Sequence, residues 1–424
     1  MNAPIIQAPT IEMLKLLEEM TAFSAPGPGV TRLLYTPEWS QAQAFLQERM
    51  ARIGLEVRTD KVGNVYGRLK GSKSEEKVIL TGSHIDTVVN GGDYDGSYGI
   101  AAAMTALHYL QRTFGQPLRS LEVVSFCEEE GSRFPLTYWG SGYVNGMYNG
   151  SEAEDNADAD GITMKTAMAE CGLESDTVVD ADKDTDGSSG VRDDIGAFVE
   201  LHIEQGILLE KTSTEIGVVQ AIVGQRRYVV KVGGTANHAG TTPMTMRQDA
   251  LAGVAEMLVE LERSAAETGA PLVATTGRLE VFPNTPNVIP GEVLFTLDIR
   301  HSEAIELENF CIYILATLNG IAVRRGLEID ITTRLNTIPA PMDLGLCGVL
   351  EDICQSQGSS YCNMVSGAGH DAQLFAPRCP TAMIFVPSRN GISHSPEEYS
   401  SPEQLAAGLN VLTALLYDLA YLEN

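Results

Sequence analysis

Apolar and polar residues follow two different periods along the chain of 424 residues. A spacing of three to four residues in "IEMLKLLEEM", "SQAQAFLQERMARIG" and "GIAAAMTALHYLQRTF" predicts helices with one apolar face. Short runs such as "NVYGRL", "KVILTG" and "LEVVSF" predict strands, the last of them buried. Because helices alternate with strands and polar residues gather where strands end, we expect an α/β sheet with its functional site at the strand ends.

The length of the chain exceeds the roughly 250–300 residues that a single hydrophobic core supports, so two domains are expected. Residues 216–334 show a strand–helix–strand–helix–strand pattern and are predicted to form a small inserted α+β domain. Residues 1–215 and 335–424 are predicted to form the larger α/β domain together.

Residues 151–194 interrupt this pattern with an acidic stretch that is rich in glycine and serine and poor in aromatic residues. Only "TMKTAMAECG" within it predicts a short helix. Such a composition is typical of a solvated, mobile insertion, because its carboxylates have no fixed scaffold. A cation-binding tract is the alternative interpretation.

The net charge is −27, from 29 basic and 56 acidic residues. Without a basic cluster, this charge argues against nucleic acid and anionic membrane surfaces as partners. A small anionic substrate remains compatible, since one well-placed arginine can bind a carboxylate. The seven cysteines show no paired spacing and are expected to be free thiols of a cytoplasmic protein. No apolar run approaches the ~20 residues of a transmembrane helix.

The stretch "GSHIDTVVNGGDYDGSYG" places His84, Asp86 and Asp95 in a glycine-rich loop directly after a predicted strand. Similarly, "CEEEG" collects Glu128, Glu129 and Glu130 at the end of "LEVVSF". Adjacent carboxylates repel one another, so a buried strand end should not collect them without a cation. Either these segments are exposed acidic turns, or they form part of a metal site.

Five residues in such strand-end positions combine imidazole and carboxylate groups, the ligand types that bind Zn²⁺ or Mn²⁺. A bridging carboxylate among them would allow two ions to lie ~3.5–4 Å apart. Asp86, two residues after His84, is well placed to orient that imidazole. The candidate ligands are His84, Asp95, Glu130, His202 and His394.

Six motifs in order, "GSHIDT", "EEEGSRF", "HIEQG", "NHAGTTPM", "SGAGHDAQ" and "GISHSPEEYS", resemble the M20 family of metallopeptidases and amidohydrolases. Within that family they resemble the hydantoinase/carbamoylase branch, which hydrolyses ureido and carbamoyl compounds. The resemblance covers nearly the whole chain. It implies a two-domain M20-like fold, with a catalytic α/β domain built on a mixed sheet and an inserted lid and dimerisation domain, and it implies a homodimer.

The resemblance also implies two divalent metal ions per subunit, Mn²⁺ by expectation and Zn²⁺ as the alternative. One ion is expected on His84 and His202 and the other on Glu130 and His394, with Asp95 between them. Glu129 is then the general base that accepts a proton from the attacking water.

For the substrate, the resemblance implies that His238 polarises the scissile carbonyl. Arg300 would pair with a substrate carboxylate, and Asn287 would bind the same polar end. Gln205 and the backbone at Gly369 would complete this grip. His370, next to Gly369, is expected to support the site by hydrogen bonding.

The reaction implied is hydrolysis of a ureido C–N bond, with allantoate as the expected substrate. Its products would be ureidoglycine, ammonia and carbon dioxide, a step in the breakdown of purines. N-carbamoyl-L-amino acids and ureidoglycolate are alternative substrates of the same kind. A dinuclear aminopeptidase or dipeptidase and a metal-binding protein without catalysis are the alternatives from other classes.

Overall fold

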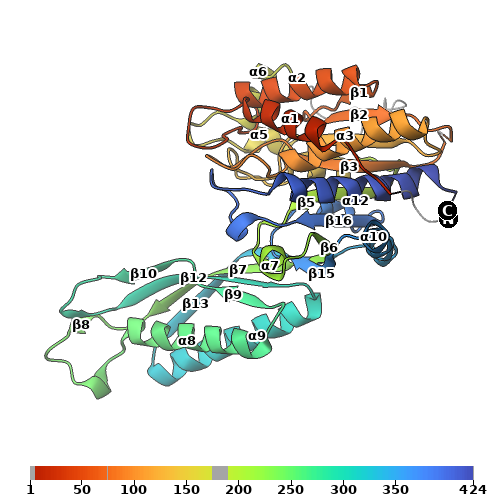
Figure 1. Ribbon diagram of the computed structural model, residues 1–424. Helices are drawn as coiled ribbons and strands as arrows, with labels where there is room; N and C mark the ends of the chain where they lie inside the picture. The colour runs from red at the N-terminus through yellow and green to blue at the C-terminus, as the bar shows by residue number, and fades with distance from the viewer. Residues whose placement is uncertain (1–4, 74, 174–189, 424) are drawn as a thin grey trace. The chain divides into compact units, whose positions relative to one another are not determined.

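The computed structural model describes residues 5–73, 75–173 and 190–423 and divides the chain into two compact units (Figure 1). Unit 1 comprises Met1–Gln220 and Met342–Asn424, and unit 2 comprises Ala221–Pro341. The predicted inserted domain, residues 216–334, overlaps unit 2, and its status as a separate domain remains a prediction.

Unit 1 alternates strands with helices, as its hydrophobic pattern predicts. Its helices are α1 (Thr10–Thr21), α2 (Pro37–Arg52), α3 (Ser97–Phe114), α4 (Trp139–Asn145), α5 (Glu152–Asp155), α6 (Met164–Glu170), α7 (Leu208–Thr212), α10 (Leu344–Gln357), α11 (Ala372–Phe375) and α12 (Pro402–Tyr421). Its strands are β1 (Glu56–Thr59), β2 (Val65–Leu69), β3 (Val78–His84), β4 (Leu121–Phe126), β5 (Ile195–Ile203), β6 (Ile216–Ile222), β15 (Tyr361–Ser366) and β16 (Thr381–Val386).

These strands form a mixed sheet in the order β1-β2-β4-β3-β5-β16-β6, with β15 also paired to β6. The four central strands β4, β3, β5 and β16 are parallel, and their neighbours β2 and β6 are antiparallel to them. The predicted α/β fold with a mixed sheet is therefore confirmed. The chain leaves β3 for β4 on one side and later returns to β5 on the other side, which is the topology that creates a binding crevice at the carboxyl ends of the strands.

Burial explains why these strands lack polar and apolar alternation. Every residue of β3, β4 and β16 is buried, as expected of strands covered on both faces. Helix α3 packs on β3, β4 and β5, and α12 packs on β5 and β16. A capping box formed by Ser401 and Gln404, followed by Pro402 in the first turn, defines the start of α12.

Unit 2 is built on antiparallel strands. Its main sheet has the order β10-β12-β7-β13, with β9 also paired to β12, and β8 pairs with β11 in a separate two-stranded ribbon. The elements are β7 (Gly224–Gly233), β8 (Asn237–His238), α8 (Ala250–Thr268), β9 (Val273–Thr275), β10 (Leu279–Phe282), β11 (Val288–Ile289), β12 (Glu292–His301), α9 (Ala304–Arg325), β13 (Glu328–Thr337) and β14 (Ala340–Pro341).

The core of unit 2 lies between this sheet and the helices α8 and α9, which run side by side on one face of it (Figure 1). Among the described helices, α9 is long and apolar enough to cross a membrane by length and composition alone. Its buried side chains, including Leu307, Ile314 and Leu318, nevertheless contribute to the core of unit 2. This packing is that of a core helix.

The acidic stretch 151–194 contains the predicted short helix, α6, and in addition the single turn α5. Residues 174–189, and the predicted behaviour of the stretch there, lie outside the described residues.

All seven cysteines are free thiols, as predicted, and four of them are buried.

Glu122, the second residue of β4, is a fully buried carboxylate held by three arginines. Its oxygens lie 2.9 Å from Arg58, 2.5 Å from Arg68 and 2.8 Å from Arg192. Burial raises the pKa of Glu122, but the three guanidinium groups outweigh it, so the net pKa lies below the ordinary value. This network joins β1, β2 and β4 to the segment that leads into β5.

We expect Glu122→Gln to lower the free energy of unfolding by about 3 kcal/mol, because the buried carboxylate that pairs with all three arginines loses its charge. Since the folded-state pKa of Glu122 is depressed, its contribution is complete above the unfolded-state value of ~4.3 and declines as the pH falls below it. Urea unfolding at pH 7 and pH 4 measures both effects. If Glu122→Gln lost the same free energy of unfolding at pH 4 as at pH 7, the stabilising role of the ionised Glu122 carboxylate would be contradicted.

Candidate metal centre and active site

The candidate metal ligands lie at the carboxyl ends of the four parallel strands. His84 is the last residue of β3 and is in register with Phe126, the last residue of β4, which precedes the three glutamates. His202 lies near the end of β5, in register with Phe385 of β16. His394 follows β16 on the next loop. Parallel strands thus deliver these residues to one edge of the sheet.

Asp95, on the loop between β3 and α3, is the centre of the cluster and is 6% exposed. Its Oδ1 lies 3.4 Å from Nε2 of His84 and 3.1 Å from Nε2 of His202. Its Oδ2 lies 3.2 Å from Nε2 of His394. The two oxygens of one carboxylate therefore face two different sets of imidazoles.

Glu130 and His394 complete the second set, with 3.3 Å between Oε1 of Glu130 and Nε2 of His394. Possible ligand atoms lie within 4.8 Å of one another in each of three groups: His84, Asp95 and His202; Asp95, Glu130 and His394; and His84, Glu129 and Glu130. Glu129 therefore lies beside the ligands. All five candidate ligands predicted from the sequence are brought together, and their roles remain predictions.

The two buried imidazoles are oriented so that Nε2 of each faces the cluster. Nδ1 of His84 lies 3.1 Å from the carbonyl oxygen of Asp86, and Nδ1 of His202 lies 2.9 Å from that of Ile203. With Nδ1 as donor, each Nε2 faces the Asp95 carboxylate, an arrangement that is repulsive unless a proton or a metal ion lies between the two atoms. Two atoms about 2.1 Å from one ion at a tetrahedral angle lie about 3.4 Å apart, which matches the observed spacings.

The same contacts shift the protonation of these groups. Burial alone would lower the pKa of His84, but Asp86 and Asp95 raise it well above its usual value. Burial raises the pKa of Glu130 to about 7, with the charge of Asp95 adding to the effect. Hydrogen bonding to Asp95 raises the pKa of His394 to about 9. Without a metal ion the cluster therefore holds protons, which bound cations would displace.

Asp86 fixes the two loops relative to each other. Its Oδ1 lies 3.2 Å from Nδ1 of His84, which confirms the prediction that Asp86 orients this imidazole. The same carboxylate accepts hydrogen bonds from the backbone amides of Glu129, at 3.0 Å, and Glu130, at 3.2 Å. Asp86 thus connects the end of β3 to the end of β4, a role that the sequence did not reveal.

Gln205 also reaches the centre, with its Nε2 donating to Oδ2 of Asp95 at 2.9 Å. Its Oε1 is buried without a hydrogen-bond partner, and its backbone has a φ of 56°, which is costly for a residue other than glycine. Gly369 has no room for a side chain, since a Cβ there would lie 2.0 Å from the hydroxyl of Tyr138.

His370 does not hydrogen-bond to a candidate ligand as we expected. Its Nε2 contacts Ser366 at 3.0 Å, and its ring packs edge-on against His202 with 4.7 Å between ring centroids. Burial and the nearby imidazole of His202 lower the pKa of His370 well below its usual value. A neutral ring of this kind limits the movement of His202 by packing.

In unit 2, the structure brings His238 and Asn287 together. They lie on the β8–β11 ribbon, where His238 is paired with Val288 and the amide of Ala239 donates to the carbonyl oxygen of Asn287 at 2.9 Å. Both side chains are exposed. This ribbon adjoins the beginning of β12, because Gly291 follows it directly and accepts a hydrogen bond from Gly234.

Arg300 lies at the opposite end of β12, in register with Gln225. The eight steps along the strand from Glu292 to Arg300 span about 27 Å at ~3.4 Å per residue. Arg300 donates to Asp298 through Nε, at 2.9 Å, and Nη2, at 3.1 Å, so its guanidinium is held in a defined orientation. Within one chain, Arg300 therefore does not lie beside His238 and Asn287.

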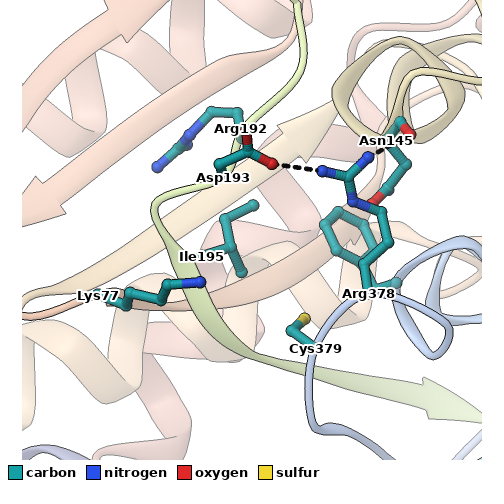
Figure 2. A pocket seen from close by; sticks show the side chains of 8 residues that line it. Lys77, Asn145, Arg192, Asp193, Ile195, Arg378 and Cys379 are labelled. Carbon is teal, nitrogen blue, oxygen red and sulfur yellow. Dashed lines mark hydrogen bonds and ion pairs between the residues drawn. The ribbon is translucent and has the colours of Figure 1, made fainter.

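A pocket elsewhere in unit 1 lies at the amino-terminal ends of β3 and β5 (Figure 2). Its lining consists of Lys77, Asn145, Arg192, Asp193, Ile195, Phe375, Arg378 and Cys379. Lys77 directly precedes β3, and Ile195 begins β5, so this pocket is at the end of the sheet opposite to the candidate ligands. Arg378 is paired with Asp193 at 2.7 Å, and Arg192 is paired with Glu122.

Comparison with known proteins matches residues 80–418 to the model of peptidase family M20/M25/M40. The chain belongs to this family. The match runs from β3, which carries His84, to α12, and so it includes all five candidate metal ligands. Family membership and the cluster of imidazoles and carboxylates together indicate that the chain binds divalent metal ions.

The chain is similar to named amidohydrolases over almost its whole length. The chain is 49% identical to allantoate amidohydrolase from Bacillus subtilis, with 94% of each chain covered. It is 46% identical to allantoate amidohydrolase from Escherichia coli, with 95% of this chain and 96% of the relative covered. It is 37% identical to N-carbamoyl-L-amino-acid amidohydrolase from Paenarthrobacter aurescens, with 97% of each covered.

A solved structure shows the same fold. The crystal structure of an amidase of the hydantoinase/carbamoylase family from Burkholderia multivorans superimposes with a TM-score of 0.90 at 33% identity. The superposition covers 97% of this chain and 98% of the other. The M20 fold with a mixed α/β sheet that the motifs predicted is thereby confirmed.

We expect Asp95→Asn to weaken the binding of both ions by roughly 100-fold or more, because each oxygen of this carboxylate serves a different set of ligands. Calorimetric titration with Mn²⁺ measures the loss. Asp93→Asn is the matched control, since Asp93 is an exposed carboxylate in the same loop and should bind metal as the wild type does. Loss of only one ion in Asp95→Asn would exclude a bridging role.

Proposed function

We propose that the chain is an allantoate amidohydrolase, a cytoplasmic enzyme that hydrolyses a ureido C–N bond. The reaction converts allantoate and water to ureidoglycine, ammonia and carbon dioxide. The observation that carries the proposal is the position of Asp95, whose two oxygens face two ligand sets with Glu129 beside them. The identities of 49% and 46% to two allantoate amidohydrolases support the choice of substrate.

We propose two ions per subunit, with His84 and His202 on one side of Asp95 and Glu130 and His394 on the other. The chemistry supplied by bound divalent ions is acidification of water and polarisation of a carbonyl group. Nitrogen and oxygen ligands suit both Mn²⁺ and Zn²⁺, and we propose Mn²⁺ as the metal used.

Glu129 acts as the general base in this proposal. Its carboxylate takes a proton from the attacking water and returns it to the departing nitrogen, so that the leaving group is neutral. Burial raises the pKa of Glu129, which makes its carboxylate a stronger base than an exposed one. The hydrogen bond from its backbone amide to Asp86 fixes the position of the loop that carries it.

The substrate carboxylate is the partner proposed for Arg300, whose orientation is maintained by Asp298. His238 donates a hydrogen bond to the ureido oxygen as negative charge develops there, and Asn287 binds a neighbouring polar group. Gln205, with one buried oxygen that lacks a partner, and the backbone at Gly369 contact the remainder of the substrate. Movement of unit 2 as a lid would exclude bulk water.

We further propose a homodimer in which each active site uses both chains. Arg300 lies near one end of β12, and the ribbon that carries His238 adjoins the other end, about 27 Å along the strand, whereas a small ureido acid is much shorter than that. The two residues can act on one substrate only if they come from different protomers. An exposed row of apolar residues on α9, including Ile305, Ile312 and Val323, and the open edge of β13 offer surfaces for such a contact.

We expect the Mn²⁺-loaded protein to release ammonia from allantoate faster than from N-carbamoyl-L-amino acids, ureidoglycolate or a dipeptide. Glu129→Gln should reduce this turnover by ~10²–10⁴-fold while the metal content is unchanged, because the base is lost and the ligands remain. Ammonia release and elemental analysis measure the two quantities. A preference for carbamoyl amino acids would change the proposed substrate but leave the proposed metal site and reaction type in place. Undiminished turnover in Glu129→Gln would overturn the assigned base.

Mixing two inactive variants tests the shared site. His238→Ala and Arg300→Ala should each be inactive alone, whereas co-refolded mixtures should regain at most about a quarter of wild-type activity, since half of randomly paired dimers are mixed and each carries one intact site. Steady-state ammonia release measures the recovery. In a shared site, His238→Ala mixed with Glu129→Gln should also regain activity, because the Glu129→Gln chain supplies its His238 to a His238→Ala chain that retains Glu129.

The mixture of His238→Ala with Glu129→Gln distinguishes a site shared between two chains from a site confined to one chain. In a shared site it regains activity as the first mixture does, because the Glu129→Gln chain supplies an intact His238 to a partner with an intact base. In a site confined to one chain, neither mixture regains activity. Arg300→Ala mixed with Glu129→Gln is the matched control and should stay inactive, since we propose that these two residues serve the same site from the same chain.

A further inference from the structure

Glu398 is a buried carboxylate close to the candidate metal centre, and although it lies in the motif "GISHSPEEYS" the proposed mechanism gives it no role. It is 5% exposed and lies four residues after His394 on the same loop. Its Oε1 accepts hydrogen bonds from the backbone amides of Tyr94, at 3.0 Å, and Asp95, at 3.1 Å. One carboxylate thus connects the loop that carries Asp95 to the loop that carries His394.

The other oxygen of Glu398 binds the hydroxyl of Ser393, the residue directly before His394. The Ser393 Oγ lies 2.8 Å from Oε2 of Glu398 and 3.2 Å from Oδ2 of Asp95. A hydroxyl has one proton and can donate it to only one of these carboxylates at a time. The shorter contact assigns the proton to Glu398, so Oδ2 of Asp95 accepts a hydrogen bond from Nε2 of Gln205 and keeps its second lone pair for a cation shared with His394.

The chain is built to admit Glu398 at this position. A Cβ added to Gly92 would lie 2.2 Å from Oε1 of Glu398, so only glycine permits the loop to pass this carboxylate. His394 has a φ of 55°, a conformation that is costly for residues other than glycine and persists only where neighbouring contacts hold it. The amide of Glu398 donates to the carbonyl oxygen of Ser395 at 3.0 Å and closes the turn that directly follows His394.

We propose that Glu398 is a positioning residue for the ion held by Glu130 and His394. It fixes the backbone of Asp95 and directs the Ser393 hydroxyl away from Oδ2 of Asp95. This inference rests on the proposed centre of two ions. His84 and His202, whose Nε2 atoms lie 3.4 and 3.1 Å from Oδ1 of Asp95, would hold the other ion, and its binding would depend less on Glu398.

Replacement of Glu398 by glutamine provides a sharp test. A glutamine oxygen can still accept the two amide hydrogen bonds, but its amide group would donate to Ser393 and turn the hydroxyl proton towards Asp95. Glu398→Gln should therefore weaken the binding of one Mn²⁺ ion by ~10–100-fold and leave the other nearly unchanged. Calorimetric titration resolves the two binding steps, and electron paramagnetic resonance should show a change from coupled to single Mn²⁺ ions.

The double variant Glu398→Gln with Ser393→Ala distinguishes positioning from general support of the fold. Without the hydroxyl there is no proton to turn towards Asp95, so the double variant should regain much of the lost affinity. A merely structural role of Glu398 predicts no such recovery. Glu397→Gln is the matched control, because Glu397 is the exposed neighbour and its change removes the same charge.

Several outcomes would overturn the inference. Equal affinity of Glu398→Gln and wild type for both ions would do so while the proposed function stands, whereas a wild type that binds no Mn²⁺ would remove the proposed centre itself. If Glu398→Gln weakened the binding of both ions equally and lowered the melting temperature, Glu398 would act only by stabilising the fold. If Glu398→Gln does not fold, Ser393→Ala alone decides, since tighter binding of the second ion in that variant would show that the hydroxyl already competes for Asp95.

Discussion

Repulsion among closely spaced carboxylates is the constraint on which the organisation of unit 1 depends. Asp86 and Asp95 are buried, and Glu128, Glu129 and Glu130 lie beside them at the same edge of the sheet. No folded chain tolerates such a group without compensation. The compensation comes from backbone amides held by Asp86, from three imidazoles around Asp95, and from the cations that these groups attract. The glycine-rich loops, the parallel strands and the lone pairs of the imidazoles are all arranged around this requirement.

The hydrophobic pattern and the local context were sufficient to predict the central features. Continuous apolar runs predicted β3 and β4, and a parallel arrangement of such strands necessarily brings their ends together. His84, Asp95, Glu130, His202 and His394 could be chosen because each follows or ends such a run. The role of Asp86 towards His84 was also predictable, because the two residues are neighbours in the sequence. Local relations of this kind are encoded over a few residues.

The remaining features depend on contacts between distant parts of the chain. The amide of Asp95 and the carboxylate of Glu398 are separated by 303 residues, and no periodicity connects them. His370 was expected to hydrogen-bond in the site; it does so with Ser366, and its ring also packs against His202, a contact that the sequence did not indicate. The separation of His238 from Arg300 follows from the register of β12 on β7, which the alternation of residues does not specify. Residue type and local context therefore indicate the candidate ligands but not the contacts that hold them in place.

The position of the substrate-binding candidates at the two ends of β12 has a consequence for how two active sites would communicate. A paired strand in the middle of a sheet is stiff along its length, so displacement of one end moves the other. In the proposed dimer, the strand that grips a substrate in one site through Arg300 also carries, beyond its other end, the ribbon that presents His238 to the second site. Binding of substrate in one site would then displace His238 in the other site. The two active sites of the dimer would therefore respond to substrate together rather than independently.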